Sequence, residues 1–371
     1  MEREQKEAIV RDLHKKMVFL TGPRQAGKTT LSISVAQEFD SHIYLNFDVA
    51  EDRRVILDRS WHPSVELVIL DEIHKLPDWK NYLKGVYDGR VAHQKFLVTG
   101  SARLEVFTEV GDSLAGRFFL HRLLPLSPSE CEKVKAPYSV EHFLERGGFP
   151  EPFLAENKTE ADRWRLQYVD SLLRTDVLDF ENIQNVKAIR LIFEMLQERV
   201  GSPISYSSIA QDVSISPNTV KKYIQILEAL YIVFRITPFS RNIVRSLLKE
   251  PKIYFFDLGL VRGDPGVVFE NLIALSLLKF IYKKVDYEAQ IYALHYLQTK
   301  ERREVDFALV LDKKLEKLIE VKLSNGTPSR SLHYFHERYD VPAVQVVKDL
   351  KKEKIDHGIE LISGINFLKR L

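Results

Sequence analysis

The sequence predicts an α/β protein of several domains, on three observations. A glycine-rich loop lies between an apolar strand and a helical pattern within residues 17–39. Two later runs, residues 65–72 and 95–101, have the nearly unbroken apolar composition of strands in a parallel sheet covered on both faces. A helix pair with two strands, residues 204–256, precedes a last segment of helix and strands. At 371 residues, the chain is too long for one ordinary core, so we expect two or three domains.

The composition is that of a soluble globular protein, with 29% charged and 45% hydrophobic residues. The net charge of +2 neither demands nor excludes nucleic acid as a partner. The single cysteine, Cys131, excludes an internal disulfide framework and fits a reducing cytoplasm. We find no apolar run near the roughly 20 residues of a membrane helix, and the charged N-terminus lacks the apolar core of a signal peptide. The expectation is a cytoplasmic protein without a membrane partner.

The glycine-rich loop has the GxxxxGK[ST] spacing of a phosphate-binding loop in its usual strand–loop–helix setting. A strand at residues 17–20 precedes it, and a helix at residues 31–39 follows it. Backbone N–H groups of such a loop close around a phosphate, and the helix dipole adds to the attraction. We expect Lys28 to reach the β- and γ-phosphates of ATP and Thr29 to hold Mg²⁺. The expected nucleotide-binding residues here are Gly22, Pro23, Arg24, Gln25, Ala26, Gly27, Lys28, Thr29 and Thr30.

The apolar run at residues 65–70 ends in two acids, Asp71 and Glu72. Ligands bind at the carboxyl ends of strands in open α/β sheets. Asp71 is therefore expected to hold Mg²⁺ through water, and Glu72 to orient or polarise the attacking water. Two surface acids at a strand end would have the same local sequence, but the preceding phosphate loop favours the functional interpretation.

Two further polar residues allow a functional and a structural interpretation each. Ser101, or Thr99, ends the apolar run of residues 95–101 and could sense the γ-phosphate; a helix N-cap at Ser101 is the alternative. Arg117 precedes a strand-like run at residues 119–126 and could stabilise transition-state charge, in its own or in a neighbouring subunit. Its alternative role is a salt bridge or anchor on the sheet. Oligomer formation is an expectation tied to the first role.

Residues 201–262 have the pattern of a winged helix-turn-helix, after a helical segment with predicted helices at residues 129–146, 158–181 and 186–200. A short helix, 206–212, precedes a second one capped by Ser216 with Pro217 at its first position. Strands at residues 232–237 and 252–256 follow. DNA binding is one interpretation, and packing on the nucleotide domain or binding of protein is the other. The candidate DNA contacts are Asn218, Thr219, Lys221, Lys222 and Gln225, with Arg241, Arg245 and Lys249 in the wing position.

The last segment predicts a helix at residues 268–282 and strands at residues 290–297, 303–311 and 317–323. A three-residue hairpin loop, 312–314, would pair residues whose numbers sum to 626. Asp306 then lies opposite Glu320, with Lys322 on the same face. Two acids and a lysine suit a divalent metal with a polarised water, and Glu270 could add a carboxylate. The alternative is a plain ion pair between Glu304 and Lys322.

Asp306-Phe307 followed by Glu320-Val321-Lys322 resembles the PD-(D/E)XK nuclease fold, with Glu270 matching the acid of its first helix. Val305 stands where the motif has proline. The whole chain resembles archaeal and bacterial AAA-type ATPases with such a C-terminal domain, through GPRQAGKTTL, LVILDEI, LVTGSA, SLAGRFF, GGFPE, FENLIA, EVDF and IEVK. The resemblance implies four domains: an AAA-type P-loop ATPase (1–126), a helical lid and connector (127–200), a winged helix (201–262) and a restriction-endonuclease-like α/β domain (263–371).

These patterns together predict an ATPase that binds DNA and couples ATP hydrolysis to a metal-dependent nuclease-like domain. The expected catalytic residues are Lys28, Glu72, Arg117, Asp306, Glu320 and Lys322. The expected metal ligands are Thr29 and Asp71 for Mg²⁺ beside ATP or ADP, and Glu270, Asp306 and Glu320 for Mg²⁺ or Mn²⁺. Two alternatives remain: a nucleotide-switched interaction protein with an inactive C-terminal scaffold, and a transcription regulator.

Overall fold

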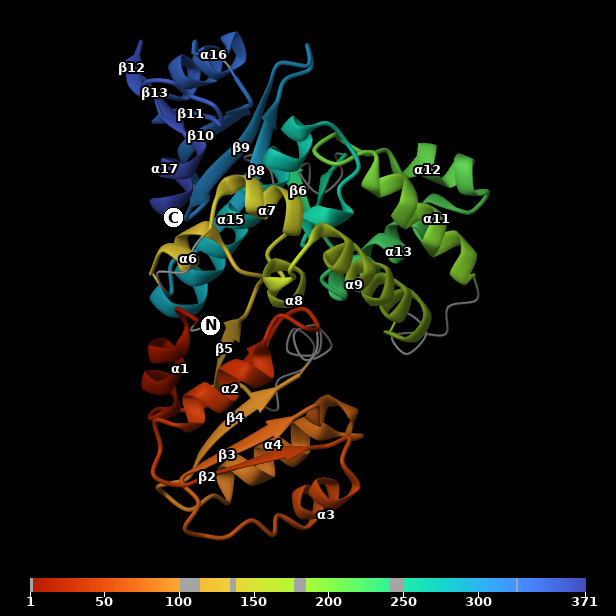
Figure 1. Ribbon diagram of the computed structural model, residues 1–371, viewed down its shortest axis with the longest axis vertical. Helices are drawn as coiled ribbons and strands as arrows, with labels where there is room; N and C mark the ends of the chain where they lie inside the picture. Colours follow the sequence, from red (N-terminus) through yellow and green to blue (C-terminus); the bar gives the residue numbers. More distant parts are fainter. Residues whose placement is uncertain (1–2, 101–113, 134–137, 177–184, 241–249, 325) are drawn as a thin grey trace. The chain divides into compact units, whose positions relative to one another are not determined.

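The computed structural model describes residues 3–100, 114–133, 138–176, 185–240, 250–324 and 326–371. The chain divides into two compact units, Met1–Pro125 and Leu126–Leu371. Figure 1 labels the helices and strands of both units, and each unit is described by itself here.

A five-stranded parallel sheet is the centre of the N-terminal unit (Figure 1). Each neighbouring pair in it is parallel. The carboxyl ends of its strands therefore share one edge, where open parallel sheets bind ligands. In spatial order the strands are β2 (His42–Asn46), β3 (Leu67–Asp71), β4 (Lys95–Thr99), β1 (Met17–Thr21) and β5 (Phe118–Arg122).

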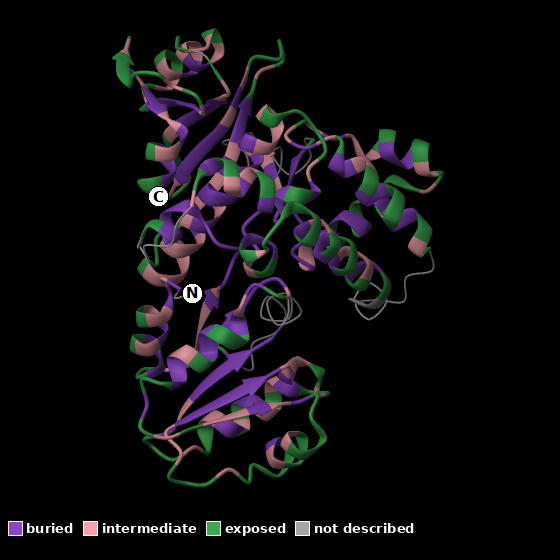
Figure 2. Cartoon of the chain, in the orientation of Figure 1, coloured by how far each residue is buried: buried purple, intermediate pink, exposed green. Residues whose placement is uncertain are grey.

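Side-chain alternation along these strands gives the sheet one core on each face. Val18 and Leu20 of β1 belong to the core that also includes residues of α1 and α2. Met17 and Phe19 belong to the core shared with α3 and α4. The three inner strands β3, β4 and β1 are buried almost throughout, as Figure 2 shows in purple, whereas the edge strands β2 and β5 are mostly half-buried. The helices are α1 (Lys6–Leu13), α2 (Lys28–Ala36), α3 (Ala50–Asp58), α4 (Trp79–Asp88) and the 3₁₀ turn η1 (Ile73–Lys75).

The first half of the second unit is helical, but its helices differ from the predicted ranges. The single helix expected at residues 129–146 is two helices, α6 and α7, and residues 134–137 between them lie outside the described residues. The helix expected at residues 158–181 is α-helical to Ser171 and continues as a π-helix to Asp176. The described helices are α6 (Pro128–Lys133), α7 (Val140–Arg146), α8 (Pro150–Leu154), α9 (Lys158–Ser171), α11 (Val186–Gln197), α12 (Tyr206–Val213) and α13 (Pro217–Ala229).

An eight-stranded mixed sheet organises the rest of this unit. It continues through the pair β6·β7, because β6 also pairs in parallel with β8. The strands predicted for the winged helix and those predicted for the nuclease-like domain thus form one sheet. Its order is β12 (Lys354–Asp356), β13 (Ile359–Ser363), β11 (Ala343–Val347), β10 (Lys314–Lys322), β9 (Glu304–Leu311), β8 (Tyr292–Gln298), β6 (Val233–Pro238) and β7 (Lys252–Phe255).

The hairpin β9–β10 has the predicted register but not the predicted loop. Asp312 and Lys313 alone form the turn, both with positive φ, as a two-residue type I′ turn requires. Near the turn the paired numbers sum to 625, as in Lys314 with Leu311. A shift between Leu315 and Lys317 then brings Ile319 opposite Phe307, the predicted sum of 626. The irregularity therefore compensates for the shorter loop.

The helix α15 (Pro265–Glu288) begins at Asp264, whose carboxylate accepts hydrogen bonds from the N–H groups of Gly266 and Val267. With 24 residues it is longer than predicted. By length and composition alone it could cross a membrane, but more than half of its most apolar window is buried inside the protein. The helices α16 (Arg330–Tyr339) and α17 (Gly364–Lys369) complete the described chain.

Candidate functional site

The glycine-rich loop joins β1 to α2 and has the backbone that a phosphate cradle needs. Gly22 has φ +142°, and a Cβ there would lie 2.2 Å from the carbonyl oxygen of Leu123. Gly27 caps α2 with φ +94°, in the left-handed region. The helix begins at Lys28, three residues earlier than predicted, so Thr29 and Thr30 lie in its first turn. The unpaired N–H groups of that turn and the helix dipole suit an anion.

Lys28 is 8% exposed and lies folded against its own loop. Its Nζ donates to the carbonyl oxygens of Gly22 and Pro23, at 3.0 and 2.7 Å. Burial lowers the pKa of the Lys28 ammonium to about 8, against the opposing effect of Glu72 and Asp71. The Lys28 ammonium is thus held against the carbonyl groups of its own loop. With a pKa of about 8, it loses its proton at mildly alkaline pH.

ATP affinity should therefore fall as the pH rises through 8. An adjacent phosphate favours the ammonium form, so ATP binding requires a proton that free Lys28 has lost above that pH. Between pH 7 and pH 9 we expect the ATP affinity to weaken about tenfold, with proton uptake on binding. Calorimetric titration in two buffers of different ionisation enthalpy measures both. Lys28→Arg keeps its charge and should lose this pH dependence; a constant affinity in the unchanged protein would contradict the assignment.

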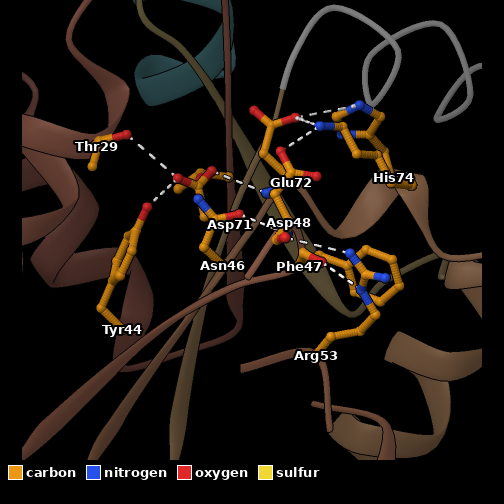
Figure 3. Close-up of polar contacts among 11 residues, drawn as sticks. Thr29, Tyr44, Asn46, Phe47, Asp48, Arg53, Asp71, Glu72 and His74 are labelled. Atoms are coloured by element: carbon orange, nitrogen blue, oxygen red, sulfur yellow. Dashed lines mark hydrogen bonds and ion pairs between the residues drawn. The ribbon is translucent and has the colours of Figure 1, made fainter. Parts of the chain in front are cut away.

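Asp71 ends β3 and is surrounded by hydrogen-bond donors (Figure 3). The Thr29 hydroxyl donates to Asp71 Oδ2 at 3.4 Å, and the Tyr44 hydroxyl donates to the same oxygen. Asp71 Oδ1 accepts from the Glu72 N–H at 3.0 Å and from the Thr99 hydroxyl. The strand register explains this meeting, since β2, β3 and β4 bring Asn46, Asp71 and Thr99 side by side. Thr29 and Asp71 thus lie together, as the sequence predicts for a shared Mg²⁺.

Glu72 leaves the strand through a left-handed turn with φ +56°. Its carboxylate lies 3.6 Å from His74 Nε2 and 3.6 Å from Lys75 Nζ. Burial raises the pKa of this carboxyl, and the charge of Lys75 opposes the rise. A desolvated acid beside Asp71, the aspartate expected to hold Mg²⁺, is suited to polarise a water. His74 is a neighbour that the sequence did not suggest.

The remaining nucleotide-site predictions have different outcomes. Thr99, weighed beside Ser101 as the γ-phosphate sensor, contacts Asp71, whereas Ser101 lies outside the described residues. Arg117 Nε and Nη2 donate to both carboxylate oxygens of Asp88, at 2.8 and 3.0 Å. This surface ion pair is the structural alternative foreseen for Arg117; a catalytic role in an oligomer stays a prediction.

A second group of charged side chains lies on the eight-stranded sheet. Lys252, the first residue of β7, is 1% exposed. Its Nζ lies 2.6 Å from Glu304 Oε1 and 3.9 Å from both Glu270 Oε1 and Asp306 Oδ1. Burial and the charge of Asp306 raise the pKa of Glu270 to about 8. Lys252 was not predicted as a member of this group, because its partners are distant along the chain.

The predicted partners Glu320 and Lys322 contact each other at 2.8 Å. Burial, followed by the charge of Asp306, raises the pKa of Glu320 to about 7. Glu304 contacts Lys252 rather than Lys322, so the predicted ion pair Glu304–Lys322 is replaced by a different one. No group of three or more His, Cys, Asp or Glu side chains within the described ranges is arranged to hold a metal.

The pair α12–α13 and the strands β6 and β7 follow the order of the predicted winged helix. On α13, Val220, Ile224 and Leu227 are buried, as their spacing predicts. The outer positions Asn218, Lys221, Lys222 and Gln225 are exposed. The predicted wing residues Arg241, Arg245 and Lys249 lie outside the described residues.

Three protein families match successive parts of the chain. Residues 14–132 match an AAA domain, residues 138–263 a domain of unknown function, and residues 265–364 a second domain of unknown function. With the geometry of the phosphate loop and of Asp71, the first match makes residues 14–132 a P-loop ATPase domain of the AAA type.

Several relatives and solved structures are similar to the chain. An uncharacterized protein of Mycobacterium tuberculosis is 29% identical over 263 residues, covering 69% of this chain, and this chain spans 58% of that relative's length. An uncharacterized protein of Methanocaldococcus jannaschii is 24% identical, covering 97% of this chain and 86% of its own length. A Walker-type ATPase of Pyrococcus abyssi is 13% identical, with TM-score 0.46, covering 70% of this chain and 94% of that structure.

Proposed function

We propose that the N-terminal unit binds ATP with Mg²⁺ and hydrolyses the bond to its γ-phosphate. The observation that carries this proposal is the hydrogen bond between Thr29 and Asp71, with Glu72 next in the chain and Lys28 inside the loop. Hydroxyl and carboxylate oxygens are the donors that Mg²⁺ prefers. Thr29 and Asp71 would hold Mg²⁺ there, and the ion would supply positive charge against the charge that develops on the phosphates.

The residues around the phosphates have separate roles in this proposal. The N–H groups of the loop and the first turn of α2 hold the phosphate oxygens, and Lys28 supplies a positive charge to them. Glu72 orients the attacking water and accepts its proton. Tyr44 and Thr99 fix the carboxylate of Asp71 through their hydrogen bonds.

Phosphate release from ATP tests the proposal. The full chain should release phosphate with Mg²⁺ and not with EDTA. Lys28→Ala should reduce the rate to background, because the loop loses the charge that faces the phosphates. Lys84→Ala, at an exposed position of α4, is the matched control and should leave the rate unchanged. Equal rates for Lys28→Ala and Lys84→Ala would end the proposal.

A second function, DNA binding through α13, is supported by its row of exposed polar residues opposite the buried apolar side. Phosphate contacts by lysine give affinity that falls with salt. Lys221→Ala should weaken binding of a duplex in fluorescence anisotropy and lower the salt dependence, while the exposed Lys158→Ala should not. Binding of a protein partner at this surface is the alternative. If α13 binds a protein partner instead, the DNA affinity should be too weak to measure in both variants.

DNA cleavage by the C-terminal unit stays a third prediction. One observation favours it: Oε2 of Glu320 is buried and has no hydrogen-bond partner among the described residues, close to Asp306 and Lys322. A scaffold that only binds partners is the alternative. The contact of Lys252 with Glu304 favours it, because the lysine already neutralises charge in this group of acids. Digestion of duplex, single-stranded and branched DNA with Mg²⁺ or Mn²⁺, in parallel with Asp306→Asn, separates the two.

A further inference from the structure

A cavity of about 680 Å³ lies in the helical part of the second unit. Its wall comes from the helices α9 and α11, the π-helical turn η2 (Leu172–Asp176) and the segment around the 3₁₀ turn η3 (Leu258–Leu260). Pockets for small organic ligands have volumes of about 300–1,000 Å³. The described residues that line this cavity lie within residues 138–263, which match a domain of unknown function, and none of them belongs to the nucleotide site.

The inner wall of the cavity is apolar. Leu173, Phe193 and Leu260 line it, and all three are buried. Leu166 lines it as well, yet this residue is 74% exposed. A leucine that is both exposed and part of the lining lies at the entrance, where it extends the apolar wall toward solvent. The cavity therefore suits a ligand with an apolar body, which would remove these side chains from water.

The charged residues of the lining carry more positive than negative charge. They are Arg165, Arg174, Arg190 and Arg262, with Asp162, Asp170 and Glu194. Arg174 Nε and Arg190 Nη2 both donate to the same oxygen of Asp170, at 2.7 and 3.1 Å. Two guanidinium groups thus share one carboxylate. Both arginine side chains are exposed, so their other N–H groups can donate to an anion in the cavity.

Gln197 is an independent sign that the cavity holds a molecule. It is 5% exposed and lines the cavity. Its Nε2 donates to the carbonyl oxygen of Leu260 at 2.9 Å, which fixes the orientation of the amide. Its Oε1 is buried, with no hydrogen-bond partner in the described part of the chain. Since buried acceptors have donors in nearly all proteins, the donor here is an N–H or O–H group of a molecule in the cavity.

We propose that this cavity binds an organic anion with an apolar body, an aromatic or aliphatic carboxylate or sulfonate. The anionic group lies between Arg174 and Arg190, and the apolar body packs on Leu166, Leu173 and Phe193. The turn η2 supports this assignment, because single π-helical turns occur frequently at functional sites and this one places buried Leu173 and exposed Arg174 in the same lining. The inference goes beyond ATP hydrolysis and does not depend on it.

Fluorescence titration of the full chain with two probes tests the charge of the ligand. Anilinonaphthalene sulfonate has aromatic rings, an N–H group and one negative charge, and phenylnaphthylamine has the same rings and N–H group without the charge. Arg190→Gln should lower the affinity for the sulfonate about tenfold and leave that for the uncharged probe unchanged. Arg163→Gln, at an exposed position of α9 outside the lining, is the matched control and should change neither affinity. Equal sulfonate affinities in the two variants, or equal losses for the two probes, would overturn the anion assignment.

The place of the probe is tested at the entrance of the cavity. Leu166→Glu puts a carboxylate on the apolar wall, so the affinity for both probes should fall about tenfold or more. Leu154→Glu, on α8 outside the lining, is the matched control, because Leu154 is also an exposed leucine, at 64%. Both substitutions lie at exposed positions, and urea unfolding should show the midpoint of the unchanged protein. An unchanged probe affinity in Leu166→Glu, or an equal loss in Leu154→Glu, would overturn the site.

Discussion

Glu72→Gln should lower the rate of ATP hydrolysis by at least about 100-fold and leave ATP binding intact, because a general base contributes 10²–10⁴ to a rate. The amide keeps the shape of the side chain but cannot accept a proton from water. Lys28, Thr29 and Asp71 are unchanged, so the phosphates and Mg²⁺ should still be held. The variant should therefore accumulate bound ATP.

Two measurements on one preparation check this result: phosphate release for the rate and calorimetry for the affinity. Glu51→Gln, at an exposed position in the first turn of α3, is the control and should behave as the unchanged protein. A parallel loss of rate and affinity in Glu72→Gln would show that the acid shapes the binding site. A normal rate would exclude Glu72 as the base.

Arg165→Ala should lower the free energy of unfolding of the second unit by about 3–5 kcal/mol, the usual cost of breaking a buried ion pair. Arg165 is 5% exposed, and Asp257 is 1% exposed. Arg165 Nε donates to Asp257 Oδ2 at 2.9 Å, and its Nη2 donates to the carbonyl oxygen of Arg146. The substitution would leave a buried carboxylate without its cation. Burial already raises the pKa of Asp257, and the Arg165 charge opposes that rise.

Urea unfolding of Arg165→Ala measures this loss, with Arg163→Ala on the exposed side of α9 as the matched control. Asp257→Ala should cost a similar amount, and the double variant less than the sum of both. A loss below about 1 kcal/mol in Arg165→Ala would mean that the pair contributes like an exposed one. Gly147 and Gly259 pack directly on this ion pair. A Cβ at Gly147 would lie 2.4 Å from Asp257 Oδ1, and a Cβ at Gly259 would lie 1.9 Å from Arg165 Nε, so a larger residue at either position would displace the pair.

The nucleotide site could be predicted because its signals are local. The phosphate loop and the two acids at the end of β3 can each be recognised within a few residues, and the carboxyl ends of parallel strands share one edge. Thr29 and Asp71 accordingly lie in contact. Tyr44 was not predicted as a partner of Asp71, since a tyrosine in a half-buried strand has the pattern of an ordinary core residue.

The group of acids around Lys252 (Glu270, Glu304 and Asp306) could be predicted only in part from local sequence patterns. Alternation and hairpin pairing brought Asp306 and Glu320 to one place, and the register of 626 was right although the loop is one residue shorter. Lys252 and Tyr254 come from β7, which reaches this cluster only through the continuous sheet across β6 and β8. Such long-range pairing follows from tertiary packing and leaves no periodic signal in the sequence. The elements from α16 to α17 were likewise not predicted.

The most direct test of the central claim is a single turnover of ATP labelled at the γ-phosphate, with the full chain in excess over ATP and Mg²⁺ present. The account predicts that labelled phosphate appears in one exponential phase in the unchanged protein, and that Glu72→Gln retains bound, intact ATP over the same period. If the unchanged protein binds ATP with Mg²⁺ and releases it unhydrolysed, the site at Thr29, Asp71 and Glu72 is a nucleotide switch, and the claim of ATP hydrolysis is contradicted.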